Sequence, residues 1–245
     1  MITVHTENFV TTISLNRPEK RNAMLPEMLE RFEAAMSGVD DSVRCVLVRG
    51  AGKVFCAGFD LKACAADESG ETMRALLTGL SRCVVAMREC SAAVVMGVHG
   101  SAIAGGCAML GGADVVVADR GAKLGYPVVK IGVSPAVSAA FLMSSVADGA
   151  ARALMLDPGL IDAQRGYELG LVHELVEDAE AVRPRTMEIA RGLAGKPGVG
   201  VRETKRLVNV ITKGRSDLGG EGLAASLSRV GSDEERAMLG AIWGS

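Results

Sequence analysis

Cysteine and histidine are the residue types that most often bind metals or attack substrates, so their spacing is the first test for chemistry. The 245 residues include six cysteines and three histidines. No two cysteines form a C-x-x-C pair, and no histidine lies at ligand spacing from one of them. We therefore expect no zinc or iron–sulfur site, and no other bound metal.

The glycine-rich segments are candidates for phosphate-binding loops, because glycine lets the backbone approach a ligand closely. The sequence has 30 glycines without a regular period. A G-x-G-x-x-G motif is absent, since Gly97, Gly100 and Gly105 do not have that spacing. A P-loop is also absent, because Gly52-Lys53 is followed by Val54 rather than Ser or Thr. Neither type of nucleotide-binding loop is expected.

Residues 132–136 read Gly-Val-Ser-Pro-Ala and loosely match the nucleophile elbow of serine hydrolases. In that turn the residue after the serine donates its backbone N–H to the oxyanion. Here that residue is Pro135, which has no N–H. His173 is the candidate base, but a single histidine beside a strand is more often structural. We reject a serine hydrolase.

Four separated segments carry the strongest pattern. Residues 15–24 read LNRPEKRNAM, residues 50–61 read GAGKVFCAGFDL, residues 98–107 read VHGSAIAGGC, and residues 203–208 read ETKRLV. In this order and at these spacings the segments closely resemble the crotonase family, which includes the enoyl-CoA hydratases and isomerases. The resemblance covers roughly residues 2–210 and weakens after Pro127.

The resemblance implies an α/β fold, a crotonase-like spiral of ββα units with a helical C-terminal layer. We expect residues 1–195 to form the spiral core and residues 196–245 to form a C-terminal helical trimerisation region. It also implies a homotrimer or a dimer of trimers, and an acyl-CoA thioester as the substrate.

By position, the resemblance makes the backbone N–H groups of Phe59 and Gly105 the two donors of an oxyanion hole. Such donors stabilise the negative charge that builds on a thioester oxygen, and losing one typically costs about 3–4 kcal/mol. Gly58 and Gly106 let the chain approach the ligand. Gly105 is expected at the start of a helix, whose positive end adds to the effect.

Coenzyme A carries phosphates, so cationic side chains are expected at the entrance. Lys20, Arg21 and Lys62 lie at or beside the positions that bind it in the family, and the backbone near Ala57 is expected to meet the adenine. The alternative for each of these side chains, taken alone, is an ordinary solvated surface residue. Coenzyme A arrives as part of the substrate, so no separate cofactor is expected.

The sequence departs from the family at the residues that handle protons. Hydratases of the family use two glutamates, and Ala108 and Val128 occupy those two positions here. Other members place an acid slightly further on, at the position of Ala136. Acid–base assistance is commonly worth about 10²–10⁴ in rate. We therefore expect ordinary hydration of crotonyl-CoA to be very slow or absent.

Three side chains are possible substitutes. Tyr126 precedes Val128 by two residues, so in a regular strand both point the same way. His99 has a suitable pKa range for a base, although a structural hydrogen bond explains it better. Asp60 is interpreted as a helix cap. Water, or a carboxylate on the substrate itself, remains an alternative.

Hydrophobic patterning predicts the elements that position these residues. We expect strands at 2–4 and 9–15 with a turn at Glu7-Asn8, and a long helix over 71–89 with apolar residues at helical spacing. The chain after about Pro135 is expected to be mostly helical. The remaining expectations are a helix at 26–36, strands at 43–48, 92–98, 114–118, 123–126 and 171–176, and a short helix near 106–111.

Composition excludes several classes of protein. The chain is 49% hydrophobic and has a formal net charge of −2, so we expect a folded core and no nucleic-acid binding. Residues 90–113 carry no charged side chain but contain six glycines, so no membrane span is expected. The first ten residues do not have the pattern of a signal peptide. We expect reduced thiols and a cytoplasmic location.

The sequence thus predicts an acyl-CoA enzyme related to enoyl-CoA hydratases and isomerases. It would act by decarboxylation, isomerisation or thioester cleavage, with an oxyanion hole and non-standard acid–base residues. A catalytically inactive acyl-CoA-binding or scaffold protein is the alternative. Phe59, Phe55, Met109, Leu124 and Val128 are candidates to line an acyl pocket, and each is equally a candidate core residue.

Overall fold

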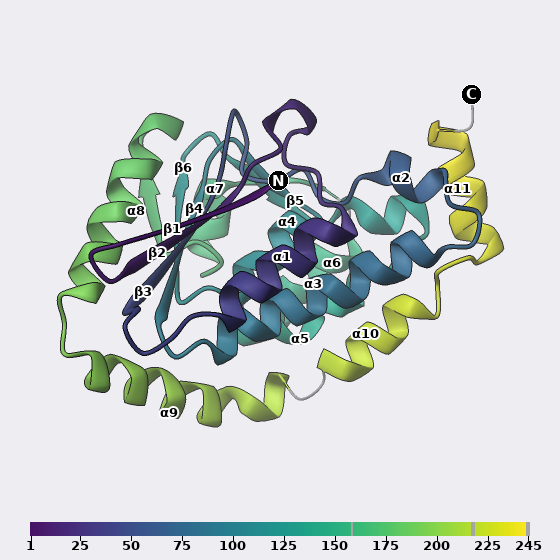
Figure 1. Ribbon diagram of the computed structural model, residues 1–245. Coiled ribbons are helices and arrows are strands. Elements are labelled where there is room, and N and C mark those ends of the chain that lie inside the picture. Colours follow the sequence, from purple (N-terminus) through teal and green to yellow (C-terminus); the bar gives the residue numbers. More distant parts are fainter. Residues whose placement is uncertain (158, 217–218, 244–245) are drawn as a thin grey trace.

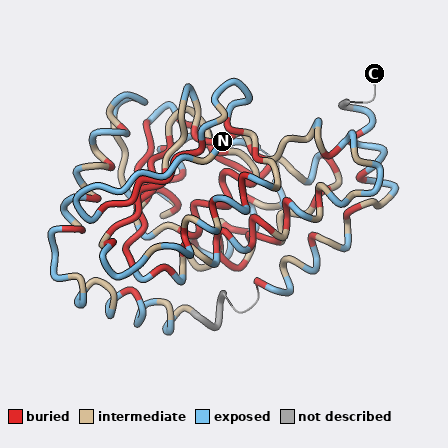
Figure 2. Tube along the Cα trace, in the orientation of Figure 1, coloured by how far each residue is buried: buried red, intermediate tan, exposed pale blue. Residues whose placement is uncertain are grey.

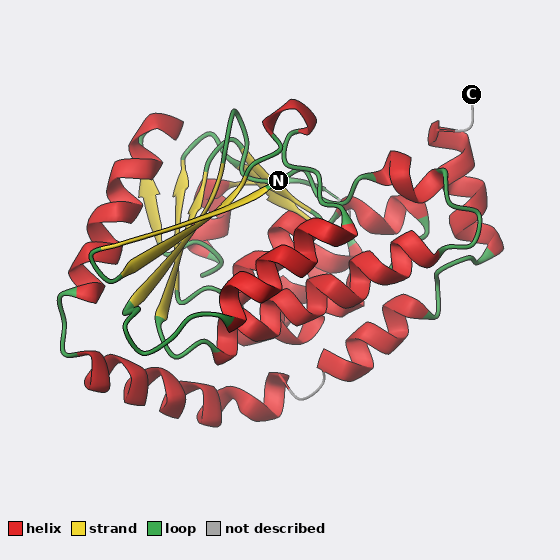
Figure 3. Cartoon of the chain, in the orientation of Figure 1, coloured by secondary structure: helices red, strands yellow, loops and turns green. Residues whose placement is uncertain are grey.

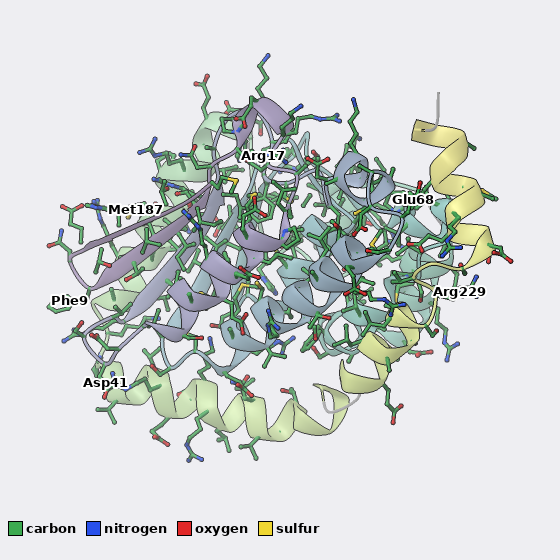
Figure 4. The ribbon with its side chains drawn as sticks, turned by 45° about the vertical axis from the view of Figure 1, so that its right-hand side comes forward. Phe9, Arg17, Asp41, Glu68, Met187 and Arg229 are labelled. Carbon is green, nitrogen blue, oxygen red and sulfur yellow. The ribbon has the colours of Figure 1, made fainter. Side chains whose placement is uncertain are left out.

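The computed structural model describes residues 1–157, 159–216 and 219–243. The chain begins with a hairpin of β1 (Ile2–Glu7) and β2 (Val10–Leu15). Its two loop residues, Asn8 and Phe9, have φ of +51° and +65°. Two left-handed residues define the turn that matches the twist of the flanking strands. Figure 4 shows Phe9 at this end of the hairpin.

A six-stranded sheet follows from this hairpin, in the order β1-β2-β3-β4-β6-β9. All of its pairs except β1–β2 are parallel. A second, three-stranded sheet has the order β5-β7-β8. The further strands of the large sheet are β3 (Cys45–Gly50), β4 (Ala93–Val98), β6 (Val115–Asp119) and β9 (Glu174–Val176), and those of the small sheet are β5 (Ser101–Ile103), β7 (Lys123–Gly125) and β8 (Ile161–Asp162).

Helices cover both faces of the large sheet (Figures 1 and 3). On one side α1 (Pro26–Ser37) and α3 (Glu71–Glu89) pack together over the main core. On the other side α8 (Ala179–Ala194) packs Ala190 and Ala194 against a smaller apolar cluster that includes Leu47 and Val95. Parallel strands buried on both faces are uniformly apolar, as β4 is.

Helices and short turns dominate the second half of the chain. The last part is helical, with α9 (Gly198–Ser216) running along the edge of the molecule and much of it exposed (Figures 1 and 2). The other α-helices are α2 (Leu61–Ala65), α4 (Gly105–Ala108), α5 (Ala139–Ser145), α6 (Asp148–Leu156), α7 (Ala163–Glu168), α10 (Gly219–Leu227) and α11 (Asp233–Trp243). The 3₁₀ turns are η1 (Pro18–Lys20), η2 (Met109–Gly112), η3 (Pro127–Ile131) and η4 (Pro135–Ser138).

The long helices and strands agree with the sequence predictions, but some of the short elements were not predicted. The predicted helix over 71–89 is confirmed, and the predicted buried strands lie within a few residues of the observed ones. The sequence missed β5 and β8, which have three and two residues and no readable period, and gave no range for the five-residue α2 behind the cap expected at Asp60. In the described part of the chain, no helix is both long and apolar enough to cross a membrane.

Candidate active site

The two glycine-bearing loops meet in space. The Cys56 N–H donates to the Ser101 carbonyl at 3.1 Å, and the Ile103 N–H donates to the Cys56 carbonyl at 3.0 Å. Just beyond these bonds, Gly58 and Ala104 both have positive φ, +97° and +51°. A Cβ on Gly58 would lie 3.1 Å from the Ile103 carbonyl oxygen and 3.2 Å from the Ala104 Cβ, so the two loops approach too closely for a side chain at this position. Glycine is needed there for both its conformation and its size.

The backbone N–H groups of Phe59 and Gly105 follow directly after these two turns. On either side of Phe59 the chain bonds to Met24, which donates to the Gly58 carbonyl at 2.8 Å and accepts from the Asp60 N–H at 2.9 Å. Gly105 is the first residue of α4, where N–H groups have no partner within the helix. Neither the Phe59 nor the Gly105 N–H donates to another residue in the described part of the chain.

A buried asparagine holds the first loop in place. Asn22 is fully buried, and its Nδ2 donates to the carbonyls of Ala51, Val54 and Phe55 at 2.8–3.0 Å. Its Oδ1 accepts the Arg17 N–H at 2.9 Å. Its φ of +55° is one that asparagine tolerates better than most residues. Sequence reasoning missed this role; the available signal was a short polar side chain inside an otherwise matching motif.

An ion pair secures the same loop from outside. The Arg17 guanidinium donates to the Asp60 carboxylate at 2.7 Å, and Figure 4 labels Arg17 in this part of the molecule. Asp60 also accepts the Ala63 N–H and so caps α2, as the sequence predicted. Burial raises the pKa of Asp60, but the hydrogen bonds from Arg17 and Ala63 and the Arg17 charge outweigh it, and the net pKa is lowered. Asp60 is a charged structural residue.

Both loops open onto one cavity of about 330 Å³. Phe59 and Gly105 line it, as do Ala57, Ala108 and Val128. Most of the other lining residues are apolar, among them side chains of α3 such as Leu77. No Asp, Glu or His is among the described residues that line it. The polar lining side chains are Tyr126, Lys130, Ser134 and Ser138.

Tyr126 lines this cavity, although the regular strand on which its predicted position rested is wrong. Strand β7 ends at Gly125, and Tyr126 leads into the η3 turn, so Tyr126 and Val128 do not share a regular strand. They nevertheless line the same cavity. Burial, with the neighbouring Cys107 thiol, raises the pKa of Tyr126 well above its ordinary value. The phenol is protonated at neutral pH, and it is hydrogen-bonded to the Cys107 thiol and the Ser138 hydroxyl.

Ala136 is placed differently from the other two apolar positions. Pro135 and Val137 line the cavity on either side of it, but Ala136 lines a neighbouring hollow instead. Its carbonyl packs against Gly222 of α10. Adjacent residues of the tight η4 turn face different sides, so spacing alone did not identify which one faces the cavity.

The charged residues predicted to bind coenzyme A flank the cavity without lining it, whereas Ala57 lines it. Lys20, Arg21 and Lys62 are exposed on the segments beside the Ala57 loop. The Ala57 N–H donates to the Arg21 carbonyl at 3.0 Å, which ties the two segments together. Gly106 is buried against the first loop, where an added Cβ would lie 2.8 Å from the Cys56 Cβ.

The other candidates have structural roles. His99 Nε2 hydrogen-bonds the Gly52 carbonyl at 2.9 Å, and His173 Nδ1 accepts the Val116 N–H at 2.8 Å, so neither lines the cavity. Phe55, Met109 and Leu124 are fully buried core residues outside the cavity lining. No group of three or more potential metal ligands occurs in the described residues.

Comparison with known proteins identifies the fold and the family. The sequence model described as "Enoyl-CoA hydratase/isomerase" matches residues 5–220. The crystal structure of an enoyl-CoA hydratase/isomerase from Xanthobacter autotrophicus Py2 superposes with a TM-score of 0.89 at 31% identity, covering 97% of this chain and 91% of that one. The architecture is thus the crotonase fold, and its α/β class with a helical C-terminal region is confirmed.

Two curated relatives are similar over most of their length. The 1,2-epoxyphenylacetyl-CoA isomerase of Escherichia coli is 32% identical over 212 residues, covering 84% of this chain and 80% of that protein. An enoyl-CoA hydratase of Mycobacterium tuberculosis is 32% identical over 201 residues, covering 80% and 75%. The chain belongs to the enoyl-CoA hydratase/isomerase family of the crotonase superfamily, whose members process acyl-CoA thioesters.

Proposed function

We propose that the chain is an acyl-CoA enzyme that holds the thioester carbonyl oxygen between the N–H groups of Phe59 and Gly105. The observation that carries this proposal is that both residues line one cavity and that neither N–H donates to another described residue. Hydrogen-bond donors that the fold already holds in position stabilise a developing oxyanion without having to reorient during the reaction. Family membership independently favours a CoA thioester as the substrate.

The proton chemistry of this site is non-standard. Ala108 and Val128, at the two positions where the family's hydratases carry glutamate, both line the cavity with side chains that cannot transfer a proton. Weak or absent hydratase activity follows from this. Decarboxylation, isomerisation and thioester cleavage depend less on acid–base side chains of the protein, because in each reaction the negative charge that develops on the carbonyl oxygen is stabilised by the two N–H groups. The name of the E. coli relative gives one precedent, isomerisation of an acyl-CoA.

Tyr126 is the proposed hydrogen-bond donor. Its phenol is buried in the cavity wall and remains protonated because burial raises its pKa. A raised pKa makes Tyr126 a poor base and a usable hydrogen-bond donor. Removal of a proton from the substrate would then fall to water or to a carboxylate of the substrate itself.

Coenzyme A is proposed to bind along the exposed segments beside the cavity, as part of the substrate and without a further cofactor. Lys20, Arg21 and Lys62 supply positive charge for its phosphates, and the backbone of Ala57 and Gly58 faces the adenine. The bond from the Ala57 N–H to the Arg21 carbonyl supports this grouping, because it fixes the two segments side by side. The phosphate contacts predict that affinity falls with rising salt.

A homotrimer, or a dimer of trimers, is the proposed assembly, with residues 196–245 as its contact region. The exposed apolar side chains of α9 support this, since Leu207 and Ile211 are 54% and 73% exposed. Sedimentation should give three or six times the 25.4 kDa chain mass. The six buried, free cysteines are compatible with the proposed reducing, cytoplasmic location.

The second candidate is an acyl-CoA-binding or scaffold protein without activity, favoured by the absence of any described Asp or Glu in the cavity wall. One experiment separates the two. The protein is incubated with a panel of acyl-CoAs, products are identified by mass spectrometry, and binding is measured by calorimetry. A product supports the enzyme, binding without any product supports the scaffold, and no binding to any CoA ligand rejects both.

A further inference from the structure

Lys130 is the one charged side chain among the described residues that line the cavity. It lies on the η3 turn, two residues after Val128, and its side chain is exposed at the cavity edge. It forms no ion pair or hydrogen bond with another residue in the described part of the chain, unlike Arg17 or Lys205, which are paired with carboxylates. The cavity therefore has one unpaired positive charge.

The hydroxyl groups of the wall add donors to this charge. Ser134 Oγ accepts the Ala136 N–H at 3.2 Å, so its own proton is available to a ligand. The Tyr126 phenol in the same wall is already hydrogen-bonded to Cys107 and Ser138. Ser138 differs, because its hydroxyl donates to the Pro135 carbonyl at 2.9 Å. With donors at Lys130 and Ser134 and no Asp or Glu among the described residues that line the cavity, its polar part suits an anion.

A plain alkyl chain would leave these groups unused, whereas an ionised group would be held by a charge-assisted hydrogen bond. A carboxylate entering an apolar cavity without a partner would be strongly disfavoured. Lys130 would therefore favour an ionised acyl chain over a plain alkyl chain.

We propose that the acyl group of the substrate carries a carboxylate at its far end, and that Lys130 is the specificity residue that binds it. This inference rests on the proposed function, because it assumes that the cavity receives the acyl chain of a CoA thioester. It adds the substrate class: a dicarboxylic acid joined to coenzyme A through one of its two carboxyl groups.

The test compares acyl-CoAs of equal chain length with and without the second carboxylate. Binding of succinyl-CoA and butyryl-CoA, of glutaryl-CoA and valeryl-CoA, and of coenzyme A alone is measured by calorimetry for the wild type, Lys130→Met and Lys130→Arg. Lys123→Met, which removes an exposed lysine of β7 outside the cavity, is the matched control. Thermal unfolding checks that each variant is folded.

We expect the wild type to bind at least one carboxylated ligand about tenfold or more tightly than its uncharged partner. Lys130→Met should remove that preference and leave butyryl-CoA and coenzyme A within about twofold, while Lys130→Arg and Lys123→Met should retain it. Equal wild-type affinity within both pairs would overturn the inference and leave the proposed function standing. An equal loss for all five ligands in Lys130→Met would also overturn it, because Lys130 would then bind a phosphate of coenzyme A. Failure of the wild type to bind any of the five would reject both proposals.

Discussion

Installing glutamates in the cavity wall is the sharpest perturbation of the proposed proton chemistry. The variant Ala108→Glu/Val128→Glu places two carboxyl groups on residues that line the cavity beside Phe59 and Gly105. If the cavity already holds and polarises the thioester, the wild type lacks only the groups that position water and move its proton. The double variant should then hydrate crotonyl-CoA, and the wild type should barely exceed the uncatalysed reaction.

The expected gain follows from the usual contribution of acid–base groups. Such assistance is worth about 10²–10⁴ in rate, so we expect at least a 100-fold rise in kcat/KM. Ala108 is 3% exposed, and a carboxylate there enters a mostly apolar wall. Burial should raise the pKa of the new glutamate and cost about 1–3 kcal/mol of stability. For a chain of this size that corresponds to a Tm lower by roughly 2–12 °C.

Loss of the conjugated absorbance of crotonyl-CoA measures the reaction. Ala136→Glu is the matched control, because Ala136 lies outside the cavity lining and should gain nothing. Wild-type turnover in the ordinary enzymatic range, about 1–10³ s⁻¹, would refute the reasoning. An equal gain in Ala136→Glu would refute the assignment of positions.

The remaining expectations test the packing of the site and of the core. Gly106→Ala puts a Cβ 2.8 Å from the Cys56 Cβ, so it should displace the second loop and weaken acyl-CoA binding at least tenfold. Gly149→Ala is the control, because an added Cβ there meets nothing within 4 Å and should leave binding unchanged. Lys205→Met removes a buried ammonium bound to two carbonyls and to a carboxylate at 2.8 Å, so stability should fall by about 3–5 kcal/mol and Tm by roughly 6–20 °C in a thermal melt. Burial raises the pKa of the Cys56 thiol to about 12, so the folded protein keeps this thiol protonated. The stability that the protonated thiol contributes is therefore complete below pH 9 and is lost as the pH rises toward 12. The urea concentration at the unfolding midpoint should therefore be lower at pH 10.5 than at pH 8. A thiol reagent at pH 8 should label the six cysteines only after the protein unfolds, and rapid labelling of the native protein would contradict their burial.

The sequence predicts the long elements well because burial leaves a period in them. Helix α3 places Met73, Leu76, Leu80 and Met87 in the core at helical spacing, and β4 is apolar throughout. Strands β5 and β8 are too short to carry a period, and they form only because partners distant in the chain complete the small sheet.

The site was predicted in part, through the motif that contains Phe59 and Gly105. The supporting residues were not, because their roles depend on contacts between segments far apart in the chain. Asn22 bonds to carbonyls about thirty residues away, and nothing in its neighbours indicates them. Lys130 is one of many lysines and arginines in the sequence, and only the folded chain places it at the cavity. For the same reason Ala136 could not be separated from Val137 before the η4 turn was known.

A crystal structure with bound butyryl-CoA, or another non-reactive acyl-CoA, tests the central claim most directly. We expect the thioester oxygen to lie about 2.7–3.1 Å from both the Phe59 nitrogen and the Gly105 nitrogen. A thioester oxygen directed to any other part of the protein, or either nitrogen bonded within the fold while the ligand is in place, would contradict it.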